Sequence, residues 1–253
     1  MATYNYEYRY ELKPGRFVYI QQDKSAIAGG AIIKQVLKKY RPHRIFYHLE
    51  RRGGHVAALR LHQKSVFFSR FDIVNFFGQV TRTRIARSLR EVGFKHKRAF
   101  NIAHDSVVVE GGRKVLPYGF RQSPVLATLS LEHSLLGSEL KKLSDVGFLV
   151  SVYMDDILIS GEFKDVLEEA SEAVIESAET AGFPLSADKR AVAVAGVDSF
   201  NCHIETADIT VLNERMNKFA DDYRSKGSAG QQAIEKYIEA VSKTELARFL
   251  GMV

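Results

Sequence analysis

The chain has 253 residues, of which 45% are hydrophobic and 26% charged, so its composition supports a buried core and excludes a disordered protein. Its net charge of +6 is compatible with a polyanionic partner but does not demonstrate one. The single cysteine, Cys202, excludes an internal disulfide framework and a zinc site built on several thiolates. No long apolar run or secretory signal is found, so we expect a cytoplasmic protein that does not enter a membrane.

Apolar spacing and turn residues predict an alternation of helices and short strands. The expected elements are, in chain order, a strand-like start, a helix over 26–40, strands over 45–49 and 56–61, a buried strand over 66–74, a helix over 82–92, a hairpin of 107–109 and 114–116, a helix over 124–140, a hairpin of 148–153 and 157–160, a helix over 165–181, short strands within 192–211, and helices over 213–226 and 231–250. Pro42 ends the first helix, and Gly53-Gly54 predicts a turn between the two strands that follow. This order favours an α+β fold with helices on one face of a sheet.

Three carboxylates interrupt segments that are otherwise apolar. Asp72 lies within the buried strand, and Asp155-Asp156 separates the two strands of the second hairpin. An ionised carboxylate in such a place must be paired or bind a cation, and an aspartate in a turn can also serve as a cap. Together, three carboxylates on adjacent strand ends could hold two divalent cations for phosphoryl transfer. Salt bridges and a turn cap remain the alternative for each segment alone.

Four sequence motifs in order resemble those of reverse transcriptases, specifically the bacterial group of retron, group II intron and phage-defence enzymes. They are Phe71-Asp72-Ile73-Val74-Asn75-Phe76-Phe77, Leu116-Pro117-Tyr118-Gly119-Phe120-Arg121-Gln122-Ser123-Pro124, Tyr153-Met154-Asp155-Asp156 and Gly182-Phe183-Pro184-Leu185-Ser186-Ala187-Asp188-Lys189. A fifth stretch, 200–204, is a weaker match to the family's primer-contacting hairpin. The resemblance implies a right-hand polymerase fold with a palm of antiparallel sheet plus helices, fingers and a short helical thumb. It places fingers and palm in residues 1–212 and the thumb-like segment in 213–253.

The resemblance also implies a metal site. The residues that it assigns to the metal are Asp72, Ile73, Asp155 and Asp156, with Mg²⁺ as the cofactor and Mn²⁺ as a substitute. Asp72, Asp155, Asp156 and Lys189 are the catalytic residues that it implies. Lys189 would protonate the pyrophosphate leaving group, and the alternative for Lys189 is a solvated lysine in a turn.

Nucleotide contacts follow from the same resemblance. Phe77, five residues after Asp72, matches the steric gate that excludes a ribose 2′-hydroxyl, with a core aromatic as the alternative. Phe76 would then point to the opposite face of a strand. Tyr118 stands where the family usually has glutamine, and Gly119 belongs to the same loop.

A basic side chain for the triphosphate is expected in the fingers. Arg60 and Lys64 are the candidates, and Arg51 or Arg52 could serve instead. The alternating tyrosines of the first ten residues predict an exposed face of an edge strand. The other interpretation is a stacking surface for nucleic acid or a hydroxyl donor for protein-primed synthesis.

The function predicted is an RNA-directed DNA polymerase that acts in bacterial antiviral defence. Its expected partners are an RNA template, a dedicated non-coding RNA, the DNA product, dNTPs, and a second copy or a partner protein. The last partner is expected because the segment after Thr210 offers only about two helices, separated by a flexible stretch over 225–230. The alternatives are an untemplated or protein-primed DNA synthase and a non-catalytic scaffold that binds nucleic acid. An RNA-dependent RNA polymerase is disfavoured, because those enzymes usually carry glycine before the paired aspartates.

Overall fold

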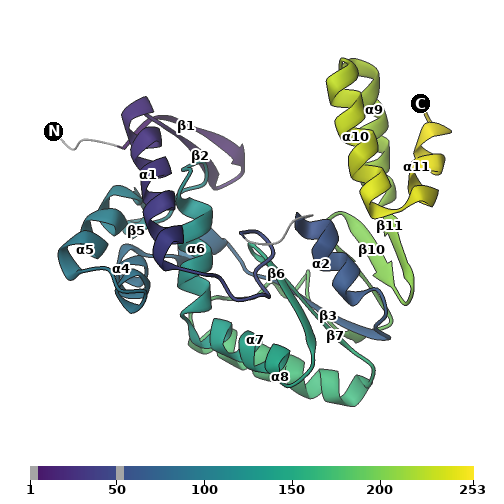
Figure 1. The fold of residues 1–253 in the computed structure, drawn as a ribbon, viewed down its shortest axis with the longest axis horizontal. Coiled ribbons are helices and arrows are strands. Elements are labelled where there is room, and N and C mark those ends of the chain that lie inside the picture. Colours follow the sequence, from purple (N-terminus) through teal and green to yellow (C-terminus); the bar gives the residue numbers. More distant parts are fainter. Residues whose placement is uncertain (1–4, 50–53) are drawn as a thin grey trace.

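A four-stranded antiparallel sheet in the order β6-β7-β3-β8 lies at the centre of the protein (Figure 1). The computed structural model describes residues 5–49 and 54–253. The strands of this sheet are β3 (Phe67–Asp72), β6 (Leu149–Tyr153), β7 (Asp156–Gly161) and β8 (Ala191–Val194). Helices α7 (Leu135–Asp145) and α8 (Lys164–Thr180) pack on one face, and α2 (Gly54–His62) packs against β6.

The sheet separates two hydrophobic cores because its side chains alternate between faces. Phe71, Ile157 and Ile159 belong to the larger core, which continues into α7 and α8. Phe68 and Leu158 point the other way, into a second core shared with α2 and the C-terminal helices. Burial on both faces explains why these strands are nearly continuous apolar runs, in which a charged residue stands out.

Helices and hairpins that are not part of this sheet lie beside it, and we refer to this group as the fingers region. Its elements are β1 (Tyr6–Lys13), β2 (Arg16–Gln21), α1 (Asp23–Lys39), α3 (Phe76–Gln79), α4 (Arg82–Glu91), α5 (His96–Asp105), β4 (Val108–Glu110), β5 (Arg113–Val115) and α6 (Ser123–Glu132). β1 and β2 form an antiparallel hairpin, as do β4 and β5. In β1, Tyr8 and Tyr10 are exposed and Tyr6 packs edge-on against Tyr19, while Tyr4 lies outside the described residues.

The C-terminal part contains a small sheet and three helices. The sheet has the order β11-β10-β9, with strands β9 (Gly196–Ser199), β10 (Cys202–Glu205) and β11 (Asp208–Val211). The helices are α9 (Asn213–Ser225), α10 (Ser228–Val241) and α11 (Lys243–Leu250). Met216, Ile238 and Phe249 join the same core as β10, so these helices are packed onto the sheet region. The division of the chain at 212/213 remains a prediction.

Two of the predicted strands are wrong. Residues 54–62 form helix α2, in which Val56, Leu59 and His62 recur at three-residue spacing and are buried. The second segment, residues 45–49, does not form a strand. It makes an isolated bridge between Phe46 and Val152, and Phe46 is buried. Apolar runs this short do not distinguish a strand from a buried helix, and packing against β6 decides in favour of the helix.

Other predicted boundaries also need correction. The helix expected over 124–140 is two helices, because Ser134 caps α7 by accepting from the Gly137 amide. Ser242 likewise separates α10 from α11, so the C-terminal segment has three helices rather than two. Helix α10 begins at Ser228, inside the stretch predicted to be flexible. Helix α5 was not predicted at all. Within the described residues, no helix is long and apolar enough to cross a membrane.

Candidate active site

Three carboxylates meet where strands of the central sheet end. Asp72 is the last residue of β3 and lies opposite Asp156, the first residue of β7. The Ile73 amide donates to the Asp155 carbonyl at 2.9 Å, which ties the end of β3 to the turn before β7. Met154 has φ +61 in that turn, a conformation uncommon for a residue with a side chain. The backbone thus brings the sequence-predicted aspartates together from positions more than 80 residues apart.

Two of the carboxylates are bound to cationic side chains. Lys189 Nζ lies 2.7 Å from Asp72 Oδ1, and Arg70 Nη2 lies 2.9 Å from Asp156 Oδ1. Asp155 has no ion pair with any described residue. Arg70 is part of the same strand as Asp72, and the sequence analysis did not single it out. Its only signal was a cation inside a buried apolar strand.

The electrostatics show that negative charge is unfavourable at this place. Burial raises the pKa of Asp155, and repulsion from Asp156 and Asp72 raises it further. A hydrogen bond from its own backbone amide lowers this pKa but does not cancel the rise. Burial also raises the pKa of Asp156, although the Arg70 guanidinium beside it works in the opposite direction. A cation at the turn would stabilise all three ionised carboxylates.

The donor set fits a divalent cation by its chemistry. Mg²⁺ and Mn²⁺ prefer hard oxygen ligands, and carboxylates on adjacent strand ends supply them. As the described side chains are arranged, no three His, Cys, Asp or Glu are gathered closely enough to hold a metal ion. Asp72 and Asp156 accept from Lys189 and Arg70 instead. The assignment of the metal to Asp72, Ile73, Asp155 and Asp156 therefore remains a proposal.

Phe77 and Tyr118 form an aromatic pair. Their ring centroids are 4.6 Å apart at an interplanar angle of 85°. The expected strand alternation is wrong here, because Asn75 at φ +48 turns the chain into the short helix α3. Phe76 and Phe77 are consequently both buried, with Phe77 7% exposed. The structure allows either interpretation of Phe77, a core aromatic or a gate at the edge of a nucleotide site.

The loop that carries Tyr118 is held against strand β2. The Tyr19 amide donates to the Tyr118 carbonyl at 2.8 Å. Gly119 has φ +101, and a Cβ atom there would collide with the Tyr19 carbonyl oxygen, so glycine is required for this close approach. Burial raises the pKa of the Tyr118 hydroxyl, and the charges of Asp155 and Asp72 also raise it. Tyr118 therefore lies within electrostatic reach of the carboxylates.

Arg16 is the basic residue that the fold brings to this side of the site. It is half-buried at the start of β2, and its guanidinium lies 4.9 Å from the centroid of the Tyr118 ring. Its charge lowers the pKa of Asp155. The sequence analysis missed Arg16, because nothing in the first 20 residues indicates that a hairpin folds back over residue 118.

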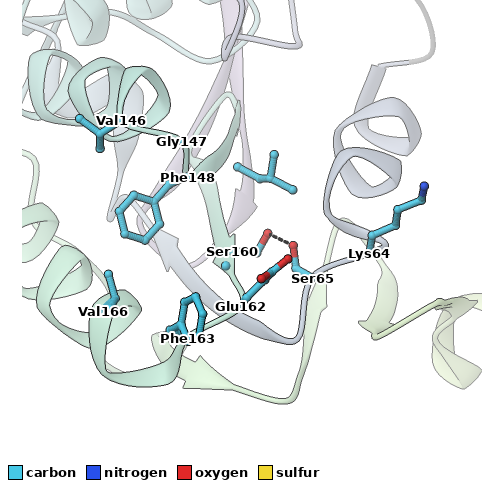
Figure 2. A pocket seen from close by; sticks show the side chains of 11 residues that line it. Lys64, Ser65, Val146, Gly147, Phe148, Ser160, Glu162, Phe163 and Val166 are labelled. Carbon is cyan, nitrogen blue, oxygen red and sulfur yellow. Dashed lines mark hydrogen bonds between the residues drawn. The ribbon is translucent and has the colours of Figure 1, made fainter.

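The two predicted triphosphate residues lie elsewhere. The guanidinium of Arg60 donates to the Ala240 carbonyl of α10. Lys64 lines a hollow of about 520 Å³ beside the ends of β6 and β7, with Phe148, Glu162 and Phe163 (Figure 2). None of the three carboxylates at the strand ends lines this hollow. Arg51 and Arg52 lie outside the described residues.

An aromatic group connects the aspartate turn to the C-terminal helices. Tyr153, which precedes the turn, packs edge-on against His48, His55 and Phe200. His55 Nε2 lies 3.3 Å from the hydroxyl of Tyr237 in α10. Burial lowers the pKa of both histidines, so both are neutral near pH 7.

Comparison with known proteins identifies the family. The reverse transcriptase (RNA-dependent DNA polymerase) family profile matches residues 22–253, and the chain belongs to this family. The Gag-Pol polyprotein of Rous sarcoma virus subgroup C (strain Prague) is 40% identical over 76 residues, which cover 30% of this chain and 5% of the polyprotein. The Gag-Pol polyprotein of avian leukosis virus subgroup A (isolate RSA) matches to the same extent. The chain thus corresponds to a small part of these relatives.

Solved structures show the same fold. A telomerase from Candida albicans, in complex with the TWJ fragment of telomeric RNA, has a TM-score of 0.59 at 10% identity. The similarity covers 90% of this chain and 46% of the telomerase. A telomerase from Candida tropicalis has a TM-score of 0.55 at 11% identity, over 86% of this chain and 43% of that one. At such identities the likeness shows the mixed α+β fold alone.

Proposed function

We propose that the protein is an RNA-directed DNA polymerase that adds dNTPs to a 3′-hydroxyl. The observation that carries the proposal is the meeting of Asp72, Asp155 and Asp156 at the strand ends of a reverse transcriptase fold. A module that only bound nucleic acid would have no need of three clustered carboxylates, two of which have their pKa raised by burial.

Asp72 and Asp155, with Asp156 in support and the Ile73 carbonyl beside them, would hold Mg²⁺ or Mn²⁺. When bound, such ions lower the pKa of the attacking hydroxyl and stabilise charge on the transferred phosphate and the leaving pyrophosphate. The ion pairs with Lys189 and Arg70 would then be exchanged in whole or in part for pairing with the metal. Each partner is a cation that pairs with a carboxylate and would hold it in position until the metal binds.

The chain's other residues would bind and orient the nucleotide. We propose that Arg16, rather than Arg60 or Lys64, pairs with the triphosphate, since it lies over Tyr118 and acts on Asp155. Phe77 would exclude the ribose 2′-hydroxyl. Tyr118 would stack on the sugar or base, with Gly119 fixing the loop. Lys189 Nζ would give its proton to the leaving pyrophosphate and is already positioned by Asp72.

Incorporation of labelled dNTPs or rNTPs on an RNA template tests the proposal. We expect templated dNTP incorporation in the parent protein and none in Asp155→Asn. The matched control is Asp188→Asn, an exposed carboxylate next to Lys189 that is not assigned to the site. Incorporation that is independent of template would favour the untemplated or protein-primed synthase. Absence of incorporation with either nucleotide, from a folded protein that binds RNA, would favour the non-catalytic scaffold.

We also propose that a bound RNA, a second copy or a partner protein completes the grip on the primer–template. The C-terminal segment supplies only three short helices, which pack onto the sheet region through one apolar core. The net charge of +6 is modest for a protein that must hold a duplex alone. Light scattering and the absorbance ratio of the natively purified protein test this. A nucleic-acid-free monomer that extends long products processively would contradict it.

The bacterial type and a role in antiphage defence in the cytoplasm are further proposals. They are supported only by the resemblance of the four sequence motifs to retron, group II intron and phage-defence enzymes. Expression of the parent and of Asp155→Asn in bacteria challenged with phage tests the role. Equal plaque numbers on both strains would contradict it.

A further inference from the structure

Positive charge is concentrated in two segments of the fingers. Residues 31–41 and 81–104 together contain eleven lysine and arginine residues and one acidic residue, Glu91. The whole chain has a net charge of +6, so the remaining residues carry a net charge of −4. The modest total therefore hides a strongly basic region on an otherwise slightly acidic molecule. Such asymmetry indicates an interaction with a polyanion more directly than the net charge does.

The fold brings the two segments together on one surface. Lys39 Nζ donates to the Gly93 carbonyl between α4 and α5 at 3.1 Å, and Arg98 of α5 donates to Gln35 Oε1 of α1 at 2.7 Å. Helices α4 and α5 pack against each other, and they lie at the edge of the molecule away from α9–α11 (Figure 1). We define the basic fingers face by the exposed cations of this surface, which are Lys34, Lys38, Lys39, Arg87, Arg90, Lys95, Lys97 and Arg98.

The cations of the basic fingers face lack acidic partners. None of the eight forms an ion pair with an acidic side chain within residues 5–49 and 54–253. Some exposed cations elsewhere are paired: Arg44 pairs with Asp145, and Lys142 pairs with Glu139. A like-charged surface without internal neutralisation is an unfavourable arrangement that an external polyanion would relieve.

The same surface also has a hollow and an exposed aromatic ring. Arg87, Arg90, Glu91, Phe94 and His96 line a hollow of about 600 Å³ at the junction of α4 and α5. Phe100 is 42% exposed. It stacks on His104 with centroids 6.2 Å apart, and Arg82 lies 5.1 Å from its centroid. An exposed ring with a cation beside it is typical of sites on which an unpaired base stacks.

We propose that the basic fingers face binds the phosphodiester backbone of a structured RNA and that an unpaired base of this RNA stacks on Phe100. The surface shares no residue with the carboxylates, Phe77, Tyr118 or Arg16. It is therefore a second nucleic-acid site, and it does not depend on the polymerase activity proposed above. The RNA is a separate stem–loop, which presents both phosphates and unpaired bases. The single-stranded part of the template presents the same groups, and the test distinguishes it.

The test uses the full chain with four cations removed. The variant Arg87→Gln, Arg90→Gln, Lys95→Gln, Lys97→Gln loses four unpaired charges of the face. The control Arg44→Gln, Lys141→Gln, Lys142→Gln, Lys164→Gln loses four ion-paired charges of the palm, and therefore has the same net charge. Binding of a labelled stem–loop RNA is measured by fluorescence anisotropy as salt is raised. A primer–template with and without a long single-stranded template overhang is measured in parallel.

We expect the face variant to bind the stem–loop about 10- to 100-fold more weakly than the control, with a shallower salt dependence. Extension of a primer–template with only a short template overhang should stay unchanged, which separates this site from the proposed function. A loss confined to the substrate with the long overhang would support the face and assign the RNA to the template. Phe100→Ala should weaken binding of the stem–loop and leave binding of a fully paired RNA duplex unchanged.

Equal RNA affinity and salt dependence in the face variant and the control would overturn the proposal. A second copy is the competing partner. Residues 162–180, which comprise α8 and the two residues before it, contain seven acidic residues and one lysine, so this helix of a second copy could pair with the face. A fall in the molecular mass measured by light scattering in the face variant, without a loss of RNA affinity, would assign the surface to self-association instead. Equal loss of stem–loop and duplex binding in Phe100→Ala would overturn the stacking role of Phe100.

Discussion

The central sheet carries two polar clusters that differ in how completely the protein satisfies them. At the strand ends, Asp72, Asp155 and Asp156 face two cations, Arg70 and Lys189. Asp155 lacks an ion pair with any described residue, and burial and mutual repulsion raise its pKa. This cluster costs the fold free energy, since charge is held where water is partly excluded.

The second cluster lies within the sheet and is uncharged. The ring nitrogens of His62 lie 2.7 Å from Ser160 Oγ and 2.8 Å from Ser151 Oγ, and Ser65 Oγ lies 2.7 Å from Ser160 Oγ. All four side chains are buried. Burial lowers the pKa of His62 to about 3, so the ring is neutral and one nitrogen accepts while the other donates.

The contrast distinguishes a polar site built for a ligand from one built for the fold. Every polar atom of the His62 side chain has a partner, as expected of a buried network that stabilises the structure. The aspartates are left with excess negative charge at a place where the main chain is strained at Met154. Removing a residue from each cluster should therefore have opposite effects on activity and stability.

Asp155→Asn is expected to have the largest effect on activity. It should reduce nucleotide incorporation by about 10³-fold or more, because the ligand of the proposed metal is lost. The free energy of unfolding should stay equal or rise, since an unfavourable buried charge is removed. Incorporation assays and urea denaturation of the same preparation measure both. Near-parental incorporation by Asp155→Asn and by the double variant with Asp72→Asn would refute the catalytic assignment.

His62→Ala should show the opposite behaviour. It leaves Ser151 without its histidine partner, removes one of the two partners of Ser160 and opens a cavity, so the free energy of unfolding should fall by about 2–4 kcal/mol. Incorporation per folded molecule should be unchanged at a temperature where the variant is folded. A specific loss of incorporation without a loss of stability would show that the two clusters are not separate.

The same histidine predicts a pH dependence of stability. Its pKa is about 3 in the folded protein, against about 6.5 in the unfolded chain. As pH falls from 6.5 towards 3, His62 binds a proton in the unfolded chain but not in the folded protein. The free energy of unfolding therefore falls by roughly 1.4 kcal/mol per pH unit. Above pH 6.5 the ring is neutral in both states and contributes no slope. His62→Gln removes this titration, and a parental slope in that variant would contradict the assignment.

The sequence predicted the central sheet and the aspartates because their signals are local. Asp72 and the Asp155-Asp156 pair stand inside apolar strands, and their anomaly is visible without a fold. Lys189 was found only through the family motif, and its ion pair with Asp72 joins residues 117 apart in the chain. The strand ends and Lys189 could therefore be anticipated in outline, while Arg70 and the ion pairs that the two cations form could not.

The errors lie where tertiary packing decides. Residues 54–62 have an apolar spacing that fits a strand or a helix, and contact with β6 selects the helix. Arg16 reaches the site only because β2 is held beside Tyr118, a contact between segments about 100 residues apart. Arg60 was expected at the triphosphate, yet α2 turns it to the carbonyl of Ala240.

Phe77→Ala tests whether the aromatic ring at the edge of the charged cluster discriminates between rNTP and dNTP. If the ring is the gate, the ratio of rNTP to dNTP incorporation should rise by about 10- to 100-fold, because a clash with the 2′-hydroxyl is relieved. The ratio is independent of the fraction of folded protein, which matters because Phe77 is buried and its loss destabilises the core. Phe77→Val, a smaller truncation, should give an intermediate ratio. Equal ratios in all three proteins would leave Phe77 as a core aromatic.

Lys189→Gln should reduce incorporation less than Asp155→Asn does. Glutamine can still donate to Asp72 but cannot transfer a proton, so kcat should fall by about 10- to 100-fold while KM for dNTP changes little. Lys189→Arg keeps the charge but holds its proton too tightly to act as an acid, and it should stay as slow as the glutamine variant. If arginine instead restores kcat, Lys189 acts by neutralising Asp72, as Arg70 does for Asp156. The two cations would then share one role, which is to pair with the carboxylates and position them until a metal replaces them.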